Sequence, residues 1–113
     1  MEKEKGYSQV TQDVLSYIEE NSPDRLSLAE IAGDRNWNID HMIRSFKRDT
    51  GLTPHKYITR VKADFAISFI SQGMNLQDIA DRLGYSSVSS LSAAFKNVTK
   101  RNLSEYKSRQ ARS

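Results

Sequence analysis

Few side chains in this sequence have the types and spacing that catalysis requires. The two histidines, His41 and His55, have no cysteine near them, because the chain contains none. A thiolate nucleophile and a cysteine-containing metal site are therefore excluded. The sequence also contains no Ser/His/Asp arrangement, no H-E-x-x-H pattern and no glycine-rich phosphate loop. We expect neither enzymatic activity nor a cofactor or bound metal.

Positive charge is the chemistry that the sequence supplies in quantity. The net charge of +3 hides an uneven distribution along the chain. Residues 1–40 hold four Lys/Arg against nine Asp/Glu, whereas residues 41–113 hold thirteen against five. Such asymmetry is typical of a protein whose basic part binds an anionic partner, most often nucleic acid. The alternative is that the uneven charge serves solubility alone.

The bulk composition is that of a small globular protein. A length of 113 residues, with 37% apolar residues and a mean hydropathy of -0.66, fits one compact domain or two very small lobes. The N-terminal stretch MEKEKGYSQV has no apolar run, and no apolar run elsewhere is long enough for a membrane span. We therefore expect a cytoplasmic protein without membrane contact.

Hydrophobic periodicity and capping residues predict an all-α fold of about seven helices, with no strand pattern. Ser27, with Glu30 three residues later, has the pattern of a capping box. Asn38 and Asn75 are expected helix caps, and Gly51 suits a left-handed C-terminal turn. The expected helices are one around Val10–Ile18 capped by Ser8 or Thr11, then 27–35, 38–51, 54–72 and 75–84, one from Ser86 or Ser87 to about Asn97, and a last turn or two after Asn102.

The sequence repeats itself once. The stretch 26–51 resembles the stretch 74–100, with one extra residue in the second turn. Each copy reads as a short capped helix, a tight turn and a second helix whose apolar positions face back, which is the pattern of a helix-turn-helix. The matching positions are Ser27, Ile31, Ala32, Asn36 and Trp37 with Asn75, Ile79, Ala80, Gly84 and Tyr85, and Met42, Phe46, Lys47, Thr50 and Tyr57 with Leu91, Phe95, Lys96, Thr99 and Tyr106.

The segment between the two copies predicts how they are joined. Residues 54–72 form a helix of ~28 Å at ~1.5 Å per residue, close to the ~34 Å between successive major grooves on one face of B-DNA. We expect residues 1–53, 54–73 and 74–113 to be a first lobe, a linker helix and a second lobe of one DNA-binding domain, which reads an asymmetric site as a monomer. The linker carries two apolar rows, so it packs on more than one side, although a plain helical bundle fits this pattern too. The rows are Tyr57, Val61, Phe65 and Phe69, and Ile58, Ala66 and Ile70.

With these residues in place, the chain from Leu26 to Lys107 resembles the DNA-binding domain of the AraC/XylS family of bacterial transcription regulators. The resemblance implies binding to double-stranded promoter DNA through two helix-turn-helix units, and activation through contact with RNA polymerase. No ligand-sensing segment is recognisable, so we expect no small-molecule ligand within this chain. The chain is either a small stand-alone regulator or the C-terminal portion of a longer one. The motifs that carry the resemblance are LAEIA (28–32), FKRDTG (46–51), DIA (78–80), LGYSS (83–87), FK (95–96) and SEY (104–106).

The resemblance places base-reading positions of the first unit on Asp40, Ile43 and Arg44. Arg44 is the strongest candidate, because a guanidinium can bond guanine O6 and N7 together; a phosphate contact or a surface ion pair is its alternative. Asp40 is repelled by phosphates, so it contributes only by accepting from a cytosine amine or by orienting Arg44. Ile43 can touch a thymine methyl or simply pack within its lobe.

The second unit departs from the family at its outer positions, which are Val88, Ser89, Ser92 and Ala93. Short side chains offer methyl and hydroxyl contacts but no bidentate guanine contact, so we expect a weakly read, A·T-leaning half-site. Lys100 and Leu103 replace the glycine and proline that are usual in the family, and we expect a less regular closing turn.

Phosphate contacts are expected from exposed cations and from helix starts that donate backbone N–H groups. By resemblance His41 is a half-buried packing residue, and Trp37 and Tyr85 pack within their lobes. The rival reading is a protein-interaction module, in which a helix-turn-helix with weak DNA binding antagonises another regulator. The expected phosphate residues are Ser27, Lys47, Arg48, Arg60, Lys62, Asn75, Lys96, Lys100 and Arg101.

Overall fold

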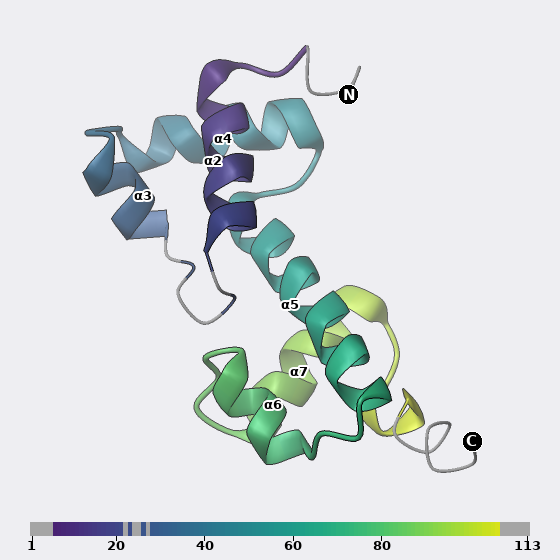
Figure 1. Cartoon of the computed structure of the whole chain (residues 1–113). Helices are drawn as coiled ribbons and strands as arrows, with labels where there is room; N and C mark the ends of the chain where they lie inside the picture. The colour runs from purple at the N-terminus through teal and green to yellow at the C-terminus, as the bar shows by residue number, and fades with distance from the viewer. Residues whose placement is uncertain (1–5, 22, 24–25, 27, 107–113) are drawn as a thin grey trace. The chain divides into compact units, whose positions relative to one another are not determined.

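The computed structural model describes residues 6–21, 23, 26 and 28–106, and these residues form helices and connecting turns (Figure 1). No strand occurs among them, so the all-α prediction is confirmed. All seven expected segments are helical within this part of the chain, while the Ser27 cap lies outside it. The helices are α2 (Gln9–Glu20), α3 (Leu28–Asp34), α4 (Ile39–Thr50), α5 (Pro54–Ser71), α6 (Leu76–Arg82) and α7 (Val88–Thr99), and residues 103–106 form a further helical turn.

Side-chain caps fix where the helices begin. In each of the four caps described below, the side-chain oxygen accepts a hydrogen bond from the backbone N–H three residues later. This satisfies a donor that the first turn of the helix leaves without a partner. Asn38 and Asn75 cap α4 and α6 as predicted. Of the alternatives that the sequence left open, Ser8 caps α2 and Ser87 caps α7. Loss of such a cap typically costs ~1 kcal/mol.

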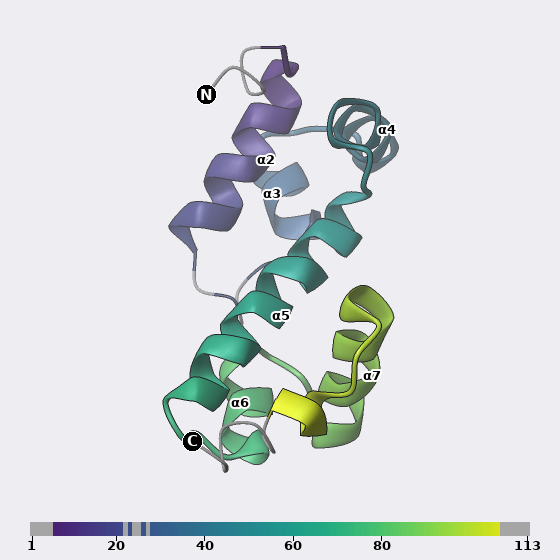
Figure 2. The same ribbon diagram turned by 90° about the vertical axis from the view of Figure 1, so that its right-hand side faces the viewer.

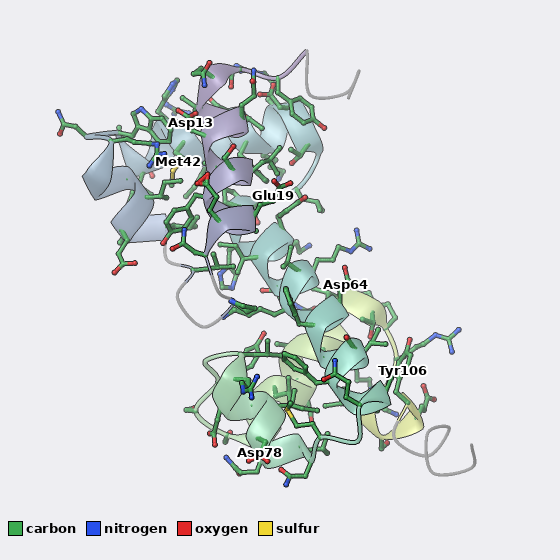
Figure 3. All side chains as sticks on the ribbon, in the orientation of Figure 1. Asp13, Glu19, Met42, Asp64, Asp78 and Tyr106 are labelled. Atoms are coloured by element: carbon green, nitrogen blue, oxygen red, sulfur yellow. The ribbon has the colours of Figure 1, made fainter. Side chains whose placement is uncertain are left out.

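The chain divides into two compact units, residues 1–58 and 59–113, and the division falls within α5. The first unit has its core between α2, α3 and α4, where α2 and α3 both contact α4 (Figure 1). Met42 lies in this core (Figure 3). The buried side chains are Thr11, Val14 and Ile18 of α2, Ile31 and Ala32 of α3, Met42, Ser45 and Phe46 of α4, and Pro54 and Ile58 at the start of α5.

The second unit has its core between α5, α6, α7 and the turn after α7 (Figure 2). The side of α5 that faces this core differs in part from the prediction. Ala66 and Ile70 are buried as expected, but Ala63 is buried too, while Phe65 is 40% exposed. The core residues are Ala63, Ala66, Ile70, Ile79, Ala80, Leu83, Leu91, Phe95 and Leu103.

The repeat therefore extends further than the sequence comparison showed. The buried residues of α2 are Thr11, Val14 and Ile18, and the buried residues of α5 in the second unit, Ala63, Ala66 and Ile70, have the same spacing. In each unit, then, a helix with this spacing of buried residues precedes the helix-turn-helix. The sequence comparison missed this because the connection after α2 is longer than the connection after α5.

One carboxylate joins α2 to α4 in the first unit. Asp49 Oδ2 accepts hydrogen bonds from the Ser8 backbone N–H at 2.9 Å, the Ser8 hydroxyl at 2.9 Å and the Thr11 hydroxyl at 2.6 Å. Its side chain is only 9% exposed, and the Arg48 guanidinium lies 3.4 Å from its other oxygen. The Thr11 hydroxyl, then the Ser8 N–H, favour the charged carboxylate and lower the pKa of Asp49 to about 2.

We predict that Asp49→Asn lowers the free energy of unfolding at neutral pH, because an amide replaces a charged acceptor of three hydrogen bonds. The pKa of Asp49 is lower in the folded state than its ordinary 3.8, so its contribution is fully present above that value and is lost as pH falls toward about 2. Urea unfolding of the wild-type chain and of Asp49→Asn, measured from pH 7 toward pH 3, should show the difference between their free energies of unfolding becoming smaller in acid. Asp64→Asn, at an exposed site on α5 (Figure 3), is the matched control. A gap that is independent of pH would contradict the assignment.

Candidate nucleic-acid interface

Helix α4 turns a polar arc away from its core. Its capping Asn38 sets the first turn, and the full burial of Met42 and Phe46, one turn apart, fixes the rotation of the helix about its axis. Among the exposed positions that result, Asp40, Arg44 and Lys47 have a spacing that places them on one face. Ile43 is half-buried beside them. The residues that the sequence predicted for base reading are thus together on the outer arc of α4.

Helix α7 repeats this arrangement with different side chains. Leu91 and Phe95 occupy the buried positions of Met42 and Phe46. Ser89, Ala93 and Lys96 are exposed on the opposite arc, and Val88 and Ser92 are half-buried at its edge. The outer arc of α7 therefore presents hydroxyl and methyl groups where α4 presents a carboxylate and a guanidinium.

The turn between the two helices of each unit also repeats. In the first unit, Trp37 N–H donates to Ala32 O at 2.8 Å, and in the second, Tyr85 N–H donates to Ala80 O at 2.9 Å. The residue before each aromatic has a left-handed backbone: Asn36 with φ 56° and Gly84 with φ 81°. This duplication of backbone geometry makes each unit a helix-turn-helix.

The aromatic ring in each turn, Trp37 or Tyr85, makes a cation–π contact with a side chain of its own unit. These contacts support the prediction that the two rings pack within their lobes. The Arg35 guanidinium lies 5.7 Å from the centre of the Trp37 ring, and Asp13 of α2 is 3.8 Å from Arg35. The Lys62 ammonium lies 5.0 Å from the centre of the Tyr85 ring. Burial raises the pKa of Tyr85, so its hydroxyl stays neutral at physiological pH.

A threonine and a tyrosine close the end of each outer helix. The Thr50 hydroxyl donates to Phe46 O at 2.9 Å and accepts from Leu52 N–H at 3.1 Å; the Thr99 hydroxyl does the same with Phe95 O at 2.8 Å and Arg101 N–H at 3.1 Å. Edge-to-face aromatic pairs lie beside these turns, with ring centres 5.5 Å apart for Phe46–Tyr57 and 5.4 Å for Phe95–Tyr106. The sequence comparison matched these residues, but not the hydroxyl contacts that give them a role.

Two expectations about the outer helices are wrong. His41 is exposed, and its contact with the cap is made by its backbone N–H, which donates to Asn38 Oδ1 at 3.1 Å. The turn after α7 is as regular as the turn after α4. Lys100 has a left-handed backbone like that of Gly51, and the N–H of each donates a 2.8 Å hydrogen bond to the carbonyl oxygen four residues earlier. Leu103, in place of the usual proline, is 2% exposed and belongs to the core.

Most of the cations predicted to contact phosphate are at the surface. Lys47, Arg48, Arg60, Lys96, Lys100 and Arg101 are exposed, and Lys62 is half-buried over Tyr85. Asn75 is engaged as the cap of α6, where its Oδ1 accepts from Asp78 N–H at 2.9 Å. Ser27 lies outside the described residues. Within the part of the chain that the structure describes, no group of three His, Cys, Asp or Glu side chains is placed to hold a metal ion, and no helix is long and apolar enough to cross a membrane.

Comparison with known proteins agrees with this geometry. A family described as "Helix-turn-helix domain" matches residues 31–109. The chain belongs to this family, which is an AraC-type helix-turn-helix domain, and the resemblance seen in the sequence is confirmed.

Two curated relatives illustrate the family. The chain is 32% identical over 84 residues to the probable transcriptional regulator LumQ of Photobacterium leiognathi, covering 74% of this chain and 34% of LumQ. It is 29% identical over 85 residues to the multiple antibiotic resistance protein MarA of Escherichia coli K12, covering 74% of this chain and 67% of MarA. The chain thus spans about a third of the length of LumQ.

Solved structures show the same fold. The C-terminal domain of AraT, a response regulator from Geobacillus stearothermophilus, superposes with a TM-score of 0.82 at 22% identity, covering 92% of this chain and 88% of that one. The DNA-binding domain of AdpA, solved in complex with a target DNA, has a TM-score of 0.77 at 18% identity, covering 93% of this chain and 96% of that one.

We predict that Thr50→Val and Thr99→Val each lower the free energy of unfolding by ~1 kcal/mol, because each removes one hydroxyl that bonds both sides of a closing turn. Chemical denaturation monitored by circular dichroism measures the change. Ser89→Ala, on the exposed arc of α7, is the control and should change stability by less than ~0.5 kcal/mol. Equal effects from all three substitutions would remove the threonines from this role.

Proposed function

We propose that this chain is the sequence-specific DNA-binding part of a transcription regulator, and that α4 and α7 are its recognition helices. The observation that supports this most is the duplication: two helix-turn-helix units, with caps and buried residues at equivalent positions, each expose the outer arc of their second helix. A second helix with an exposed outer arc is the element that enters a major groove in helix-turn-helix proteins. Membership of the AraC-type family and the DNA-bound AdpA domain support the same assignment.

In this proposal α4 carries most of the base reading. Arg44 is exposed at the middle of the outer arc, and its guanidinium can donate to guanine O6 and N7 together. Asp40 lies one turn earlier on the same arc, where its carboxylate can accept from a cytosine amine or orient Arg44. Ile43, half-buried between them, keeps enough exposed surface to meet a thymine methyl. These three residues favour a half-site that contains guanine.

Helix α7 contributes less discrimination. Ser89 and Ala93 are exposed, and Val88 and Ser92 are partly exposed beside them. Methyl groups match thymine C5-methyls, and a serine hydroxyl can donate or accept, so neither distinguishes guanine by a paired contact. The second half-site is therefore A·T-leaning and read partly through DNA shape. Phosphate contacts from exposed cations such as Lys47, Arg48 and Arg60, with a smaller part for Lys62, position both helices.

Because α4 and α7 differ in the side chains that they offer to bases, one copy of the chain binds an asymmetric site. Helix α5 has 18 residues, a length of ~27 Å that is comparable with the ~34 Å between successive major grooves. By analogy with its family we propose that the bound protein activates transcription through RNA polymerase. The second candidate is a protein-interaction module that antagonises another regulator. The observation that favours it is the absence of long polar side chains at the positions of α7 predicted to read bases, which are Val88, Ser89, Ser92 and Ala93.

Arg44→Ala should weaken binding to the preferred site by ~1–3 kcal/mol and relax base preference at the position that it contacts. Selection of bound duplexes from a random pool, followed by competition binding, measures both effects. Arg60→Ala is the comparison variant: a lost phosphate contact should weaken binding to all duplexes alike and leave the selected sequence unchanged. Site selection that is indifferent to Arg44 would remove it from base reading.

Ala93→Arg should add a guanine to the A·T-leaning half of the selected site, because Ala93 has the place on α7 that Arg44 has on α4. Selection with the wild-type chain should give one asymmetric site with a guanine-containing half and an A·T-rich half. Ser90→Arg, on the cap side of the same helix, is the control and should add no guanine. A palindromic site selected by the wild-type chain would contradict the proposal that α4 and α7 contact different half-sites. Binding by the wild-type chain that is indifferent to sequence would favour the interaction module.

A further inference from the structure

The closing turns of α4 and α7 have the same backbone but different side chains. Gly51 has φ 83° and Lys100 has φ 62°, both left-handed, and the adjoining threonine contacts are the same. Left-handed backbone is readily adopted by glycine, but it brings the Cβ of other L-residues too close to the chain. Glycine is therefore the expected residue at both turns, and the lysine at position 100 needs a reason other than local conformation.

Charge is distributed differently along the two outer helices. From α4 to α7, the reading arc loses a cation, since Ala93 replaces Arg44. The closing turn gains two, because Lys100 replaces Gly51 and Arg101 replaces Leu52. The carboxylate of Asp49 is absent from the second unit, where Val98 stands in its place. Residues 47–52 thus carry a net charge of +1, and residues 96–101 carry +3.

Three cations lie within six residues at the end of α7. Lys96, Lys100 and Arg101 are all exposed, and none forms an ion pair with the described part of the chain. Lys96 continues the outer arc of α7 that Ser89 and Ala93 begin. Lys100 follows Lys96 by one turn, and its N–H is bonded to Lys96 O at 2.8 Å. The Thr99 hydroxyl fixes the backbone of Arg101.

We propose that Lys96, Lys100 and Arg101 form a phosphate clamp at the end of α7, and that Lys100 is kept in a left-handed conformation for its charge. The clamp holds the second unit on the DNA backbone, which compensates for the weak base reading of α7. This inference rests on the proposed DNA-binding function and specifies how the second unit binds. The competing explanation is purely structural, because a cation at a helix C-terminus also stabilises the helix dipole.

The test is the salt dependence of binding by the full chain to a mixed-sequence B-DNA duplex, measured by fluorescence anisotropy. Each phosphate contact contributes about 0.9 to the slope of log affinity against log salt. Lys100→Gly should lower that slope by about 0.9, so the ratio of variant to wild-type affinity should change by about 3.5-fold between 50 and 200 mM salt. Thermal unfolding should show that Lys100→Gly is no less stable than the wild-type chain, because glycine adopts the left-handed backbone without steric cost.

Further variants separate charge from conformation. Lys100→Asn removes the charge but tolerates the left-handed conformation, so it should lower the slope as Lys100→Gly does. Lys100→Arg keeps the charge and should keep the slope. Lys56→Gln is the matched control, because it removes one exposed positive charge outside the outer helices and their closing turns. Its slope should equal that of the wild-type chain.

The outcomes distinguish this inference from the proposed function. One outcome would overturn the clamp and leave the proposed DNA binding intact. In it, the wild-type chain binds duplex with a steep salt dependence, and Lys100→Gly and Lys100→Asn both keep the wild-type slope. The same slope loss in Lys56→Gln would also overturn it, because the effect would then be one of net charge. Failure of the wild-type chain itself to bind duplex in a salt-dependent manner would reject the proposed function instead.

Discussion

Two buried side chains, one turn apart on each outer helix, determine which residues that helix can offer to a partner. A helix held by a single buried residue could rotate about its axis and present a different arc. Met42 with Phe46, and Leu91 with Phe95, remove that freedom in the two units. The edge-to-face tyrosines and the threonine hydroxyls then hold the far end of each helix. Every inference about base reading depends on this fixed rotation, because it is what places Arg44 and Ala93 at equivalent positions.

The two units preserve the residues that build the fold and differ in those that face outward. Caps, turn contacts and aromatic pairs recur, whereas the charged Asp40 and Arg44 of α4 are replaced on α7 by the small, neutral Ser89 and Ala93. The first unit also has a contact that the second lacks, the Asp49 carboxylate that binds α2 through Ser8 and Thr11. A duplicated scaffold with divergent surfaces is the arrangement expected when the same geometry serves two different ligand segments.

Features encoded over a few residues could be predicted from the sequence, whereas features that depend on distant neighbours could not. The Asn38 cap and the buried Phe46 follow from local spacing, and both were predicted. The Asp49 contacts were not, because Thr11 lies 38 residues earlier and no local pattern links the two. On α5, the periodicity predicted two packed apolar rows that include Phe65 and omit Ala63, but packing in the second unit buries Ala63 and leaves Phe65 40% exposed. The regular turn at Lys100 escaped prediction because the Thr99 hydroxyl, and not a glycine, stabilises it.

The separation of structural and outward-facing residues on α7 has a practical consequence. The Ser87 side chain caps the helix by accepting the backbone N–H of Ser90, and Leu91 and Phe95 lie in the core, so the side chains of Ser87, Leu91 and Phe95 support the fold. Ser89 and Ala93 are exposed and take no part in the cap or the core, and Ser92 lies only partly covered at their edge. A combinatorial library varied at these three sites would therefore leave the scaffold intact. Under the proposed function, such a library would retarget the second unit to new sequences while the first unit keeps the protein at its original half-site.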